Sequence, residues 1–143
     1  MPEPRRMRAI AAVVLVLAVP FAVASVIGET TIANVDPKYV DYVVRPPDIP
    51  VAGEVVIGAL SAVLVVAATA ALAWSWKRDP PDAGFLSVLL PLVVVGVILG
   101  VAWRVMTAAV IGANIGATLL VLFGSPVILA LLTLAGVSTW LRR

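Results

Sequence analysis

Four long apolar runs occupy most of the sequence, and none of them contains an acidic residue. No water reaches the middle of a bilayer, so an apolar run of about 20 residues must satisfy its own backbone hydrogen bonds as a helix. The alternation of polar and apolar residues that marks the strands of a membrane barrel is absent. Only 13% of the residues are charged, against about 25% in soluble domains. We therefore predict an all-α membrane protein, a bundle of four transmembrane helices.

The predicted spans form a single membrane domain with connections of unequal length. We expect helices over residues 8–28, 54–76, 85–107 and 114–141, an outer loop over 29–53 and an inner loop over 77–84. The inner loop is short and contains two prolines, so the second and third helices are predicted to be antiparallel neighbours. Helix kinks are expected at Pro20, Pro91 and Gly124-Ser125-Pro126.

The first apolar run fits two interpretations. Arg5, Arg6 and Arg8 precede it, and small residues follow Pro20, which is the pattern of a cleaved signal peptide. The apolar stretch nevertheless continues to Ile27, which is long enough to span a bilayer. We therefore predict a retained first helix.

The placement of Lys and Arg predicts the orientation in the membrane. By the positive-inside rule, the more basic side of a multi-pass protein faces the cytoplasm. Both termini and the 77–84 loop carry most of the basic residues, whereas the other side has Lys38 and Arg45, with Arg104 at its boundary. We expect both termini to be cytoplasmic. Abundant Ala, Val, Gly and Arg with few Lys suggest the cytoplasmic membrane of a bacterium.

The outer loop is the only sizeable polar segment. Asp36-Pro37 is typical of a helix N-cap followed by its first residue, which predicts a short helix ending near Val44. The proline-rich stretch 45–50 is expected to be extended. Candidate docking residues for a partner are Asp36, Tyr39, Asp41, Tyr42 and Arg45.

Small residues recur every four positions around the third helix. Gly96 and Gly100 form one small-xxx-small pair, and Gly112 and Gly116 form another. Such pairs let two helix backbones approach closely. Two interpretations are open: an interface with a partner or a second copy, or ordinary packing between the third and fourth helices of one chain. We favour the second, because these spacings arise often by chance in a sequence rich in Gly and Ala.

Arg104 continues the same four-residue spacing at the end of the third apolar run. A cation at membrane depth often binds an anionic lipid or substrate. Because Arg104 ends its run, we favour a simpler interpretation, in which its side chain extends to the outer interface beside Trp103. A charge pair with Glu29 or Glu54 is a third possibility.

The sequence lacks the residues that most membrane enzymes use. It has no Cys and no His, which removes thiolate chemistry and the commonest base and metal ligand. A serine nucleophile would lack a base, and the missing intramembrane carboxylate argues against proton-coupled transport. We predict no catalytic residues, no metal, no cofactor and no nucleic-acid partner, because the basic residues follow the membrane topology.

These features together predict a non-enzymatic accessory, scaffold or interaction subunit of a larger membrane assembly. Its partners would be membrane lipids and another membrane protein, or a second copy of itself. The alternative is a small homo-oligomeric channel or carrier in which Gly96, Gly100 and Arg104 face a shared path.

Overall fold

The computed structural model describes residues 3–28, 43–108 and 113–141, and within these ranges all regular structure is helical. It contains α1 (Glu3–Ile27), α2 (Val51–Arg78) and α3 (Ala83–Thr107). A fourth span consists of α4 (Ala113–Leu119), a π-helical turn η2 (Leu120–Gly124) and α5 (Ser125–Trp140). Four helices are long and apolar enough to cross a membrane, as the sequence predicted. The chain is therefore a multi-pass membrane protein in its overall build.

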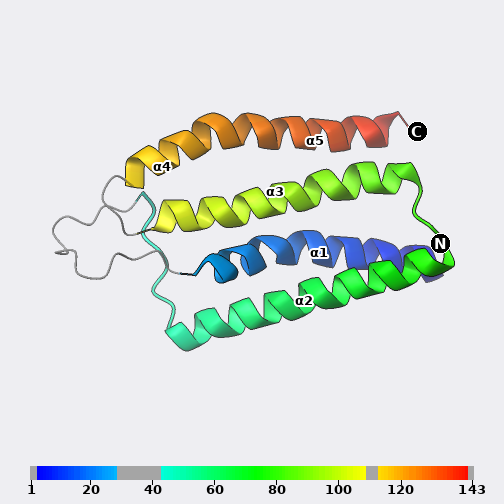
Figure 1. The fold of residues 1–143 in the computed structure, drawn as a ribbon, viewed down its shortest axis with the longest axis horizontal. Coiled ribbons are helices and arrows are strands. Elements are labelled where there is room, and N and C mark those ends of the chain that lie inside the picture. Colours follow the sequence, from blue (N-terminus) through cyan, green and yellow to red (C-terminus); the bar gives the residue numbers. More distant parts are fainter. Residues whose placement is uncertain (1–2, 29–42, 109–112, 142–143) are drawn as a thin grey trace.

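The four spans lie side by side in one row (Figure 1). The order across the row is α2, α1, α3 and then the fourth span, because α1 packs on both α2 and α3, while α3 also packs on α4 and α5. The prediction that α2 and α3 would be packed neighbours is wrong, because α1 lies between them. A short loop keeps the ends of α2 and α3 close together. It does not prevent α1 from packing between the two helices along the rest of their length.

The seam between α1 and α2 is formed by one face of α2. Residues on this face recur at alternating steps of three and four, which is the spacing of a left-handed helix pair. A Cβ atom at Gly58 would lie 2.8 Å from Cβ of Ser25 on α1, so glycine is needed for this approach. The buried or half-buried residues of the face are Gly58, Ser61, Val65, Ala68, Leu72 and Ser75.

The closest approach in the row is between α1 and α3, at two buried glycines. A Cβ at Gly100 would lie 2.6 Å from the Pro20 carbonyl oxygen and 2.8 Å from Cβ of Val23, and a Cβ at Gly96 would lie 3.2 Å from Val19. These two glycines were expected to pack against the fourth helix. They pack against α1 instead, because the α1 backbone occupies the space that their missing side chains leave.

The fourth span packs on α3 through its own small residues. Gly116 lies against Val105 of α3, and Ala117 and Ala135 are buried on the same side. The π-helical turn ends directly before Ser125 and Pro126, where the sequence predicted a kink. Proline has no N–H and its ring crowds the preceding turn, and one extra residue in that turn relieves the crowding.

The ends of α1 and α3 have local stop and start signals. Gly28 follows α1 with a positive φ of 71°, the left-handed conformation that glycine adopts most easily after a helix. The Asp82 carboxylate accepts a hydrogen bond from the Phe85 N–H at 2.7 Å and caps α3.

The structure describes only part of the outer loop. Residues 43 and 44 are not helical, so the predicted short helix does not reach Val44, and its remainder lies outside the described residues. The stretch from Arg45 to Pro50 has no regular secondary structure, as expected. The Val44 N–H donates to the Met106 carbonyl at 3.0 Å and ties this segment to the end of α3.

We predict that Gly100→Ala destabilises the protein by about 1–3 kcal/mol, because the new methyl group forces α1 and α3 apart. The matched control is Gly136→Ala on α5, where a Cβ has no neighbour within 4 Å. Thermal unfolding in detergent micelles, followed by circular dichroism, measures both changes. Equal stability of the two variants would show that the α1–α3 contact is not tight.

Candidate functional site

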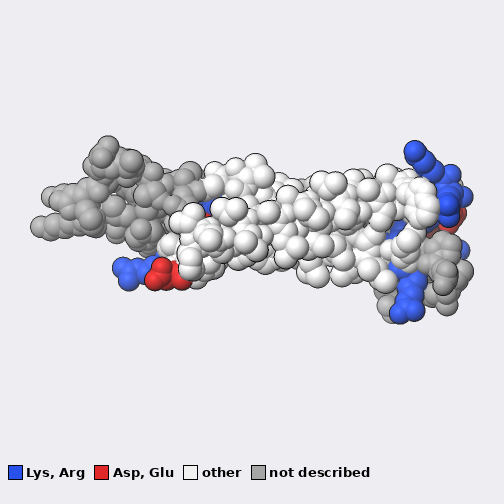
Figure 2. Space-filling model, turned by 90° about the horizontal axis from the view of Figure 1, so that it is seen from below, with Lys and Arg blue, Asp and Glu red and all other residues white. Residues whose placement is uncertain are grey.

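Charged side chains lie at the two ends of the row, and the long middle carries no visible charged residue on the face shown in Figure 2. At one end lie the start of α1, the end of α5 and the loop between α2 and α3 (Figure 1). At the other end lie the end of α1, the start of α2 and the end of α3. We call these the basic end and the outer end. Each holds one partly or fully buried arginine.

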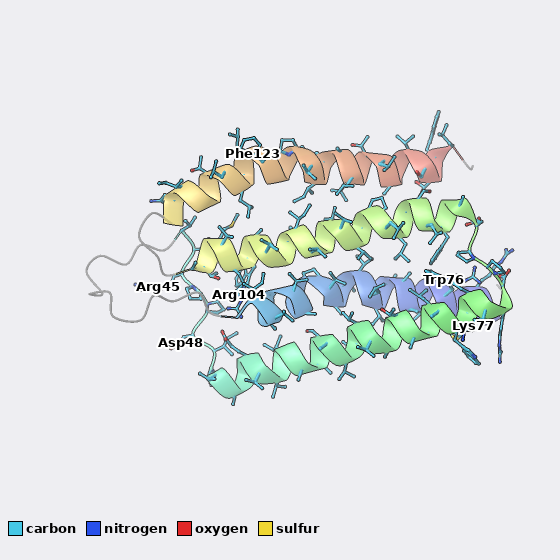
Figure 3. All side chains as sticks on the ribbon, in the orientation of Figure 1. Arg45, Asp48, Trp76, Lys77, Arg104 and Phe123 are labelled. Carbon is cyan, nitrogen blue, oxygen red and sulfur yellow. The ribbon has the colours of Figure 1, made fainter. Side chains whose placement is uncertain are left out.

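At the outer end, Arg104 reaches from α3 to the end of α1 (Figure 3). Its Nε donates a hydrogen bond to the Ala24 carbonyl oxygen at 2.5 Å. The same carbonyl also accepts the Gly28 N–H at 3.3 Å, so Arg104 is its second donor. The C-terminal end of a helix carries the negative end of its dipole, so a cation there is favourable. The Arg104 side chain is half-buried and caps the end of the neighbouring helix α1. None of the three interpretations of the sequence predicted this contact.

A cavity of about 540 Å³ opens beside Arg104. Its walls come from the ends of three helices and from the segment that precedes α2. They are mainly apolar, with Phe21, Leu99 and Trp103 among them, and Arg104 and Glu54 supply the charged groups. A mainly apolar cavity with a few polar groups, within the usual range of roughly 300–1,000 Å³, is typical of a small-molecule site.

Arg104 and Glu54 line this cavity without forming an ion pair with each other. The Arg104–Glu54 charge pair, the third possibility that the sequence offered, does not form, and Glu29, the other candidate partner, lies outside the described residues. Two opposite charges therefore line one cavity, and within the described residues neither forms an ion pair.

Of the remaining predicted site residues, Gly100 lines the cavity with Arg104, and Gly96 lies one turn earlier against α1. Gly116 faces α3 instead, and Arg45 is exposed at the outer end (Figure 3). Gly112 lies outside the described residues. The same holds for the docking candidates Asp36, Tyr39, Asp41 and Tyr42.

At the basic end, Arg8 joins three helices. Its Nε donates to Ser75 Oγ at 3.0 Å, and one terminal nitrogen donates to the Asp79 carbonyl at 2.6 Å and to Asp79 Oδ2 at 3.1 Å. Its guanidinium carbon also lies 6.0 Å from the centre of the Phe85 ring, the outer limit of a cation–π contact. The Arg8 side chain is 10% exposed. Arg8 therefore caps the C-terminus of α2 as Arg104 caps that of α1.

In the sequence, Arg8 is one of three basic residues that indicate the topology. A usable signal was present, because Arg8 is three residues before Ala11 and seven before Leu15, on the face of α1 that packs inward. A basic residue that lies on the packed face of a helix, near the end of that helix, can reach the end of a neighbouring helix.

The comparisons with known proteins identify no relative. The chain matches no family model, no curated protein and no solved structure.

We predict that Arg8→Gln destabilises the protein by about 1–3 kcal/mol, because it removes charge-assisted hydrogen bonds from a buried position. Asp79→Asn should cost less than about 1 kcal/mol, because the Asp79 carboxylate is 61% exposed, exposed ion pairs contribute little, and the Asp79 carbonyl bond remains. Thermal unfolding in micelles measures both.

Arg5→Gln is the control, since Arg5 is exposed on the same helix. A loss of stability in Arg5→Gln as large as in Arg8→Gln would mean that general charge at the basic end matters, and not the Arg8 contacts.

Proposed function

We propose that this protein is a non-enzymatic accessory or scaffold subunit of a larger membrane assembly. The observation that carries the proposal is the open row of helices, which ends in two helices with only one covered flank. In a closed bundle each helix packs on two neighbours. Among the described helices, α2 packs mainly on α1, and α5 packs mainly on α3. An assembly partner would supply the missing neighbours.

Burial along the spans supports this proposal. In the most apolar stretch of each span, 33% of the residues are buried in α3 and 28% in α1, against 17% in α2 and 6% in the fourth span. Lipid is as apolar as these side chains, so exposure alone does not drive association in a bilayer. Small exposed residues do favour it, and the exposed side of α2 contains Ala59, Ala62 and Ala70.

The proposed location is the cytoplasmic membrane of a bacterium, with both termini in the cytoplasm. In support, the basic end carries Arg5, Arg6, Lys77 and Arg78 close to the membrane boundary. Arg78 also stacks over the Trp74 ring at 4.0 Å, and aromatic and basic side chains together are typical of a membrane interface.

The alternative of a homo-oligomeric channel receives less support from the geometry. It requires Gly96, Gly100 and Arg104 on a surface shared between copies. Both glycines are buried against α1 of the same chain, and Arg104 bonds to α1 as well. The edge helices, and not this α3 face, remain available for contacts with another protein.

We predict that the edge helices contact a partner protein in native membranes. A photo-reactive amino acid is placed at Val63 on α2 or at Leu129 on α5, which are 63% and 64% exposed. Irradiation of intact cells should give protein adducts at one or both positions, identified by mass spectrometry after purification of the tagged chain. Copurification without cross-linking should recover the same partner.

The matched control is Leu17 on α1, which is 65% exposed but lies on an inner helix of the row. Equal adducts at Leu17 would indicate random collisions. Adducts only with a second copy of this chain would support a homo-oligomer and contradict an accessory role. Recovery of the monomer alone, with lipid adducts only, would also contradict the proposal.

A further inference from the structure

The cavity at the outer end lies where a membrane changes from hydrocarbon to water. Its wall residues belong to the last turns of α1 and α3 and the first turns of α2, so the cavity is at the boundary of three spans. Trp103 stands beside it, and tryptophan prefers this depth. A ligand at this position meets an apolar wall on the membrane side and charged groups near the water.

The two charged residues of the cavity come from different helices and have opposite signs. Arg104 is held by one hydrogen bond from Nε to Ala24, and within the described part of the chain its two terminal nitrogens have no acceptor. Arginine binds phosphate through such paired N–H groups. Glu54, in the first turn of α2, places a carboxylate on the same cavity.

We propose that this cavity binds a zwitterionic phospholipid with a primary ammonium group, of the phosphatidylethanolamine type. The phosphate binds the free N–H groups of Arg104, the ammonium donates to the Glu54 carboxylate, and part of one acyl chain lies against Phe21, Ile57 and Leu99. The lipid thereby bridges the gap between two charges that do not pair with each other.

The sign pattern of the cavity favours this ligand over an anionic lipid. Arg104 alone would accept any phosphate. A phosphatidylglycerol headgroup has no cation to balance the Glu54 carboxylate, and its neutral hydroxyls donate weaker hydrogen bonds than an ammonium does. A quaternary ammonium has no N–H, so a phosphatidylcholine headgroup loses the hydrogen bond to Glu54. We therefore expect the cavity to bind phosphatidylethanolamine more tightly than phosphatidylcholine or phosphatidylglycerol.

The test uses the full chain, purified in detergent and stripped of lipid, and does not involve any partner protein. Native mass spectrometry measures the lipid retained after addition of an equimolar mixture of phosphatidylethanolamine, phosphatidylcholine and phosphatidylglycerol. We expect one phosphatidylethanolamine per chain to be retained at least tenfold over each of the others, since a charge-assisted hydrogen bond in a shielded site has about this effect. Glycerophosphoethanolamine, the headgroup without acyl chains, should not displace the bound lipid, because it makes no contact with the apolar wall of the cavity.

Three variants separate the charges from the wall. Arg104→Gln should lower retention of every phospholipid about tenfold. Glu54→Gln should abolish the preference for phosphatidylethanolamine over phosphatidylglycerol while leaving phosphate binding in place. Ile57→Trp fills part of the cavity and should lower retention with both charges intact. Since Arg104 also caps α1, Glu54→Gln and Ile57→Trp keep the test valid if Arg104→Gln does not fold.

The matched control is Arg45→Gln, because Arg45 is an exposed cation at the same end that does not line the cavity. Its lipid retention should equal that of the natural sequence. Equal retention of all three phospholipids, preference for phosphatidylglycerol, or the same loss in Arg45→Gln as in Arg104→Gln would each overturn the proposal. So would displacement by the free headgroup, which would indicate a soluble zwitterion as the ligand.

Discussion

The close approach of α1 and α3 at Gly96 and Gly100 is the contact on which the rest of the row depends. It places the α1 backbone at Pro20 against Gly100, in the second half of both helices. Once these helices are joined, α2 can pack only on the far side of α1, and the fourth span only on the far side of α3. In lipid, where apolar side chains gain little from leaving their surroundings, close backbone packing is a main source of attraction between helices.

Two arginines extend this arrangement to both ends of the row. Arg8 links the start of α1 to the end of α2 by hydrogen bonds, and Arg104 links the end of α3 to the end of α1 in the same way. Each donates to a backbone carbonyl at the C-terminal end of a neighbouring helix, where the helix dipole favours a cation. Because both contacts lie at the ends of the spans, the charges stay near water and avoid the large cost of a cation in hydrocarbon. The Arg104 contact also forms one wall of the outer cavity.

The open row and the outer cavity suggest two separate roles for the surface. The edge helices α2 and α5 are proposed to contact another membrane protein, whereas the cavity is proposed to bind a lipid. These proposals share no residue, so one can fail while the other holds. A lipid at the outer end would join α2 and α3 through its headgroup and contact α1 through an acyl chain, next to the helix edge where a partner is expected. Its retention during purification would then matter for the stability of the whole assembly.

The sequence by itself determined the number of spans and their positions to within a few residues. A long apolar run has only one way to satisfy its backbone in lipid, so composition alone decides that it is helical. It also marked Gly100 and Arg104 as unusual, because their spacing and position are local properties. Which helices touch, and what Arg8 and Arg104 bind, followed only from the tertiary structure. The apolar faces of all four spans are chemically alike, so pairing depends on where small residues allow two backbones to meet, and that is decided by shape in three dimensions.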